Sequence, residues 1–149
     1  MIQLESISMT FKFFKGGEKM LPKIRAYLYI VDFNCSPEKI TSLLGINPTK
    51  VWFRGDKIGK SNRIKSSNGW MLESILVNEP DPEVHIQWLI SQLPETLEKL
   101  RSETLKWDAQ VSLVLEMVDD TPPLNLTKET ISRMAQLGLG LDIDIFWPS

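Results

Sequence analysis

A three-residue signal that starts helices occurs twice in this chain, as Ser36-Pro37-Glu38 and as Asp81-Pro82-Glu83. A side-chain oxygen can accept from the first free amides of a helix, and proline favours its first turn. Glutamate at this position complements the positive end of the helix dipole. Each signal lies downstream of an apolar segment with strand character. The chain must therefore fold into alternating strands and helices.

Six segments have the side-chain pattern of β-strands. The clearest is Ile24–Phe33, which is rich in aromatic and β-branched residues and is predicted to be a central strand. The other predicted strands cover residues 6–14, 50–55, 69–77, 108–118 and 140–147. Helices are predicted over residues 36–45, from residue 81 onward, over 93–104 around Pro94, and over 127–139. The polar residues 56–68 are predicted to join two strands as a long hairpin connection.

The order of these segments predicts an α+β fold. Strands with one polar side and few helices favour a mostly antiparallel sheet covered by helices on one face. From residue 24 to residue 118 the order is βαββαβ, which is that of a ferredoxin-like core, and an added αβ unit follows. The length fits a single domain over 1–149, in which residues 1–22 would contribute an extra N-terminal strand.

Composition restricts where the chain can work. The single cysteine, Cys35, excludes a disulfide framework and favours a reducing compartment. No apolar run is long enough to span a membrane, and the N-terminus lacks the pattern of a secretory signal. We therefore expect a cytoplasmic protein without membrane contact. The sequence leaves its oligomeric state open.

Several short motifs follow one another in a fixed order. They are Ile40…Leu44-Gly45-Ile46…Pro48-Thr49, Trp52…Gly55-Asp56, Asn68-Gly69-Trp70, Trp88-Leu89 and the terminal LGLGLDIDIF. In this order they resemble the bacterial family catalogued as domain of unknown function 4279, over residues 24–146. The resemblance implies a small bacterial α+β protein without assigned chemistry. Similar small domains occur among candidate immunity proteins of toxin systems.

The segment Lys50–Trp70 concentrates positive charge. It holds six basic residues and one acid, a net charge of +5, whereas the rest of the chain sums to −7. Its Arg54-Gly55-Asp56 would act in cell adhesion only in an extracellular protein. The candidate binding residues are Trp52, Arg54, Asp56, Arg63, Lys65 and Trp70. If both tryptophans share a face with Arg54, they form a cation–π surface for an anionic group, and if they face the helices they are core.

Two binding functions, and one explanation without any function, fit this basic segment. The first prediction is a non-enzymatic module that binds a protein or a small anionic ligand, because tryptophan and arginine commonly anchor interfaces. Basic and aromatic side chains could also stack bases and hold phosphates, although the overall charge of −2 disfavours nucleic acid. A solvated hairpin tip without a partner explains the charges equally well.

An enzyme is the alternative from another class. Catalysis commonly uses histidine, a reactive cysteine or converging carboxylates. His85 is predicted to be a half-exposed helical residue and Cys35 a partly buried thiol at a strand end. Asp142 and Asp144 lie two residues apart on a predicted strand, share one face and could hold a hard cation in a metal-dependent enzyme. No catalytic residue and no cofactor is predicted.

Overall fold

The computed structural model describes residues 22–100, 105–118 and 124–148. The predicted strand over 6–14, and the predicted extra strand within 1–22, lie outside these ranges. The described elements are β1 (Lys23–Phe33), α2 (Pro37–Leu44), β2 (Lys50–Trp52), β3 (Asn68–Glu73), α3 (Pro82–Ser91), α4 (Leu97–Leu100), β4 (Asp108–Glu116), α5 (Lys128–Gln136) and β5 (Gly140–Phe146).

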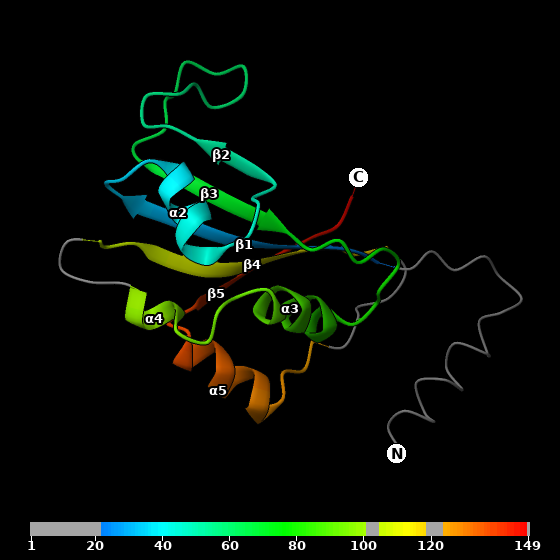
Figure 1. Cartoon of the computed structure of the whole chain (residues 1–149). Helices are drawn as coiled ribbons and strands as arrows, with labels where there is room; N and C mark the ends of the chain where they lie inside the picture. Colours follow the sequence, from blue (N-terminus) through cyan, green and yellow to red (C-terminus); the bar gives the residue numbers. More distant parts are fainter. Residues whose placement is uncertain (1–21, 101–104, 119–123, 149) are drawn as a thin grey trace, which may run out of the picture.

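All five described strands form one sheet in the order β2-β3-β1-β4-β5. The β1 strand pairs antiparallel with β3 and β4, and β2 pairs antiparallel with β3. Only β5 runs parallel to its neighbour, β4. The helices cover one face of the sheet (Figure 1). The predicted α+β fold with a mostly antiparallel sheet is confirmed, and the order of the first four strands is consistent with a ferredoxin-like core.

The side chains of β1 alternate between the two faces of the sheet. Ala26, Leu28 and Ile30 face the helices and are buried. They pack in one core with Val111, Leu113 and Leu115 of β4 and with the apolar sides of α2, α3 and α5. Burying a side chain of leucine size contributes about 1.5–3 kcal/mol, so this alternation fixes which face meets the helices. The opposite side of the sheet, which none of the described helices covers, carries Tyr27 and Tyr29, and we call it the open face.

The two helix-start signals work differently in the structure. The Asp81 carboxylate accepts a hydrogen bond from the Glu83 amide at 2.9 Å, as expected for a capping residue. Ser36 occupies the N-cap position and Pro37 the first turn of α2, as predicted, but the Ser36 side chain makes no capping hydrogen bond. The predicted glycine stop is confirmed, since Gly45 has φ of 69° and donates its amide to Thr41 O.

A hydrogen-bonded contact joins the beginnings of α3 and α5. One carboxylate oxygen of Glu83 accepts from both the amide and the hydroxyl of Thr127, each at 2.7 Å. Burial acts to raise the pKa of the Glu83 carboxyl, but the bonds from Thr127 and Thr130 outweigh it and lower that pKa below its ordinary value of 4.5. The charged carboxylate therefore stabilises the folded state relative to the unfolded one.

Glu83→Gln is expected to make stability less sensitive to acid. Because the folded pKa of Glu83 is lowered, its stabilising contribution is complete above pH 4.5 and is lost as the pH falls through the folded pKa. The free energy of urea unfolding, measured between neutral pH and about pH 3, should fall less steeply in the variant. Glu129→Gln, at an exposed position on α5, is the control. Identical pH profiles for wild type and Glu83→Gln would contradict this role.

Candidate functional site

The tripeptide Arg54-Gly55-Asp56 forms the turn that leaves β2. The Asp56 amide donates to Phe53 O at 3.0 Å, and Gly55 has φ of 94°, as the third position of a type II turn requires. The Asp56 carboxylate closes the turn by accepting from the Phe53 amide at 2.8 Å. Asp56 therefore shapes the loop through its backbone and its side chain, and Arg54 extends from the turn as an exposed cation.

Beyond this turn, the hairpin continues as a short antiparallel ribbon. Gly55 N donates to Lys65 O at 2.9 Å, Lys65 N to Asp56 O at 2.7 Å, and Ile58 N to Arg63 O at 2.8 Å. These bonds give the connection a defined shape, and it projects away from the sheet (Figure 1). We call this ordered connection between β2 and β3, residues 53–67, the arm. It holds basic side chains of the segment, and Arg63 is exposed near its end.

Asn68-Gly69-Trp70, at the start of β3, holds the base of the arm in place. The Asn68 side chain accepts from the Arg54 amide at 2.8 Å and donates to Cys35 O at 2.9 Å. Gly69 lies directly under the indole of Trp52, where a Cβ atom would overlap the ring. Trp70 faces the helices, is 0% exposed and donates its indole N–H to the Thr41 hydroxyl at 3.1 Å.

Trp52 lies on the open face, on the opposite side of the sheet from Trp70. The Lys65 ammonium lies over its ring, 4.4 Å from the centroid, and Tyr29 approaches it edge-on at 6.1 Å between centroids. Tyr27 continues the row, 5.7 Å from Tyr29. Burial, and then the neighbouring Tyr27 and Glu73, raise the pKa of Tyr29, so its hydroxyl stays neutral. We call Trp52, Tyr29 and Tyr27 the aromatic ledge.

The structure thus divides the six predicted binding residues. It brings Trp52 and Lys65 into direct contact and leaves Arg54 and Arg63 exposed on the arm. Asp56 holds the turn, and Trp70 belongs to the core and is closed to a partner. A shared surface of both tryptophans with Arg54 is therefore ruled out.

The two tyrosines were missed as candidate residues. Their positions on β1 could have revealed them, because they alternate with the core positions Ala26, Leu28 and Ile30. Residues between core positions of a strand point to the opposite face of the sheet.

His85 is not the half-exposed residue that was predicted. It is 1% exposed, its Nε2–H donates to Glu79 O at 3.1 Å, and its Nδ1 lies 3.0 Å from the Ser74 hydroxyl. In the tautomer that carries its proton on Nε2, Nδ1 accepts from the Ser74 hydroxyl. His85 ties the loop after β3 to α3. Cys35 is partly buried just after β1, as predicted, and its carbonyl accepts from Asn68.

Asp142 and Asp144 lie on the open face of β5, opposite Ser112 and Val114 of β4. Within the described residues, no three histidine, cysteine, aspartate or glutamate side chains gather closely enough to hold a metal ion. The alternative prediction of a metal-dependent enzyme therefore depends on the carboxylates of Asp142 and Asp144, which lie on the same edge strand.

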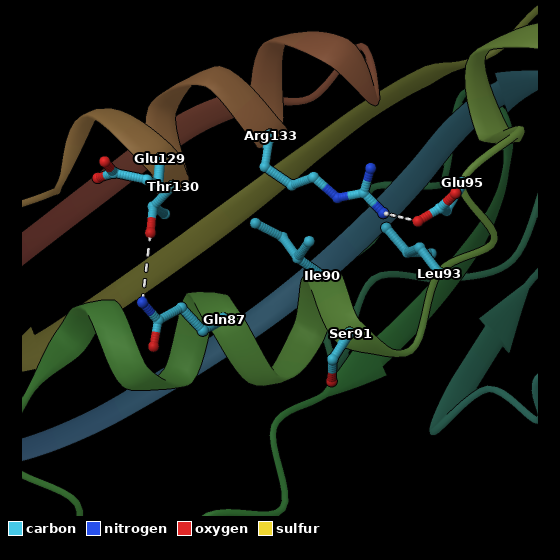
Figure 2. A pocket seen from close by; sticks show the side chains of 8 residues that line it. All are labelled: Gln87, Ile90, Ser91, Leu93, Glu95, Glu129, Thr130 and Arg133. Atoms are coloured by element: carbon cyan, nitrogen blue, oxygen red, sulfur yellow. Dashed lines mark hydrogen bonds and ion pairs between the residues drawn. The ribbon is translucent and has the colours of Figure 1, made fainter.

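A hollow of about 490 Å³ lies between α3 and α5, on the helical side of the molecule (Figure 2). Across it, the Gln87 amide donates to the Thr130 hydroxyl at 3.4 Å, and Arg133 pairs with Glu95 at 3.7 Å. The cation in this hollow thus already has an acidic partner. None of the predicted binding residues lines it.

Fold and surface together define the class of this chain. It is a small α+β domain with helices on one sheet face and an aromatic, basic surface at the β2 edge of the other face. None of the helices among the described residues has the length and apolarity that crossing a bilayer requires. The chain belongs to the family described as Domain of unknown function (DUF4279), whose model matches residues 22–147. Comparisons with curated proteins and with solved structures find no match.

Proposed function

We propose that this chain is a non-enzymatic binding module whose partner is an acidic surface of another protein. The observation that carries the proposal is the stack of the Lys65 ammonium on Trp52, beside Tyr29, at the base of a basic arm. Tryptophan and tyrosine provide contact area, and a cation held on an aromatic ring is partly desolvated before the partner arrives.

The charge distribution supports the same partner. The segment Lys50–Trp70 carries a net charge of +5, and Arg54 and Arg63 are exposed on its arm. A positive field of this kind attracts acidic surfaces and raises association rates at low salt. An acidic toxin domain would be one such partner, since similar small domains occur among candidate immunity proteins of toxin systems.

A protein partner fits the shape of the surface better than a small anionic ligand. Small-molecule sites are concave and enclose most of the ligand. The ledge lies along a sheet face. The connection between β2 and β3 projects beyond the sheet (Figure 1). An extended surface of this form suits contact with another macromolecule.

Trp52→Ala is expected to weaken partner binding by about 30-fold or more, the effect of losing an interface hot spot. Arg54→Glu should mainly slow association and reduce its salt dependence. The test is capture of a partner from bacterial lysate on the immobilised full chain, followed by titration of the purified partner. Lys128→Glu on α5, an exposed charge reversal away from the arm, is the matched control.

The outcome can reject the proposal in three ways. Unchanged affinity of both variants, each with wild-type urea stability, would remove the ledge from the interface. Binding of a labelled single-stranded oligonucleotide that falls steeply with salt would identify a nucleic-acid protein instead. Saturable binding of inorganic phosphate or citrate that Arg54→Glu abolishes would identify a small anion as the ligand.

A further inference from the structure

The outer side of β5 is a free sheet edge among the described residues. The sheet ends at β5, whose inner side pairs with β4 over its whole length. The Phe146 carbonyl accepts from the Met117 amide at 2.9 Å, so its backbone groups point toward β4. Because successive residues of a strand direct these groups to alternate sides, Leu141, Ile143 and Ile145 direct their N–H and C=O groups outward. Such groups can bind a further strand.

This edge lacks most of the features that usually protect edge strands. It runs for seven residues, from Gly140 to Phe146, without a proline or a lysine. Ile145 is 54% exposed, and Phe146 and Trp147 follow at 41% and 61%. Long edges with exposed apolar side chains are unusual in proteins that do not pair them. The strand therefore has both the backbone groups and the apolar contacts that a partner strand needs.

The charge of the strand argues against a second copy as that partner. In an antiparallel pair related by a two-fold axis normal to the sheet, residues of the same face lie opposite each other. Every register that pairs most of β5 with itself then places Asp142 or Asp144 opposite an aspartate of the other copy. Like charges directly opposite each other destabilise a strand pair.

We infer that β5 accepts an extended segment of another protein as an added strand. The segment would carry basic side chains opposite Asp142 and Asp144 and apolar side chains opposite Ile143 and Ile145. Main-chain hydrogen bonds would supply affinity, and the alternating side chains would supply specificity. The site is separate from the aromatic ledge, because β2 and β5 form opposite edges of the sheet.

Two synthetic peptides test the charge requirement on the full chain. One alternates lysine with valine and the other glutamate with valine, and fluorescence anisotropy measures their binding. The lysine peptide should bind at least about tenfold more tightly. The double variant Asp142→Lys/Asp144→Lys should reverse that preference. Equal affinity for both peptides, or a preference that the double variant leaves unchanged, would overturn the inference.

A backbone variant tests strand addition itself. Ile145→Pro removes an outward N–H that no strand of the described sheet uses, so the fold should persist while peptide binding is lost. Ile145→Thr keeps both the N–H and a β-branched side chain, so it should retain peptide binding, weakened only by the lost apolar contact. Trp52→Ala should also leave peptide binding unchanged, which separates this site from the proposed function. Wild-type peptide affinity in Ile145→Pro would overturn strand addition.

Two measurements on the wild-type chain make the test independent of how the variants fold. Amide hydrogen exchange at Leu141, Ile143 and Ile145 should slow when the lysine peptide binds, while exchange at Asp142 and Asp144 changes little. Unchanged exchange at the three outward amides would reject the site. Light scattering of the chain alone should show no association through β5. A dimer that Ile145→Pro dissociates would identify a second copy as the occupant and overturn the inference.

Discussion

Trp70→Ala is expected to lower the free energy of unfolding by about 3–5 kcal/mol, the usual cost of removing a large aromatic side chain from a core. Trp70 is 0% exposed, and its indole N–H donates to the Thr41 hydroxyl. Alanine would leave a cavity between β3 and α2 and would remove the hydrogen bond that the Thr41 hydroxyl accepts. Small domains are stable by about 5–15 kcal/mol, so the variant loses a large share of its stability. Urea unfolding followed by far-UV circular dichroism measures this loss.

Trp70→Phe is the matched variant for the same position. Phenylalanine keeps most of the apolar contact but cannot donate to Thr41, so we expect a smaller loss of stability than for alanine. The opposite pattern, with Trp70→Ala as stable as wild type but unable to bind a partner, would place Trp70 in the interface. That result would contradict the burial of Trp70 in the core.

The positions of the two long central strands could be predicted from the sequence, β1 from its aromatic and β-branched residues and β4 from its alternating apolar positions. The observed bounds Lys23–Phe33 and Asp108–Glu116 lie close to those predicted. A shift of one residue would move the whole apolar set to the open face. Long strands with one buried face therefore determine their own orientation.

The directions of Trp52 and Trp70 could not be decided in this way. β2 is only three residues long, and its register depends on the hairpin that joins it to β3. That register pairs Trp52 with Gly69, and Trp70 follows Gly69 directly on β3, so the two indoles take opposite faces. The hydrogen bonds of Asn68 and Asp56 that fix the hairpin join residues that no periodic pattern connects.

The buried His85 shows a second limit of periodic reasoning. The pattern of α3 places it beside apolar residues, but the loop after β3 is what covers it, through Ser74 and Glu79. Loops do not follow the period of a helix or a strand. Burial that depends on a loop is therefore visible only in the structure.

The residues that carry the family resemblance around the hairpin have structural roles. Asn68 joins the arm to the end of β1, Gly69 makes room for Trp52, and Trp70 fills the core. Gly55 and Asp56 form the turn. These motifs therefore define the shape of the surface, and the exposed cations of the arm, Arg54 and Arg63, are where partner preference would be set.

Gly69→Ala is expected to have the second largest effect, a destabilisation of about 1–3 kcal/mol typical of inserting a methyl group into a filled space. The new Cβ atom would overlap the Trp52 indole, which must then leave its place on the open face. Moving the ring also breaks its contacts with Lys65 and Tyr29. The proposed binding surface would be lost although no charge has changed. Urea unfolding measures the cost, and partner titration measures the loss of the surface.

A double-mutant cycle with Trp52→Ala tests whether this overlap is the cause. Once the indole is absent, alanine at position 69 meets no ring, and it is a better strand residue than glycine. Gly69→Ala should therefore cost little in the Trp52→Ala background, which gives a coupling free energy of about 1 kcal/mol or more between the two positions. If the two substitutions change the free energy of unfolding additively, glycine is needed at position 69 only for its backbone conformation. Gly69 would then have no part in positioning Trp52.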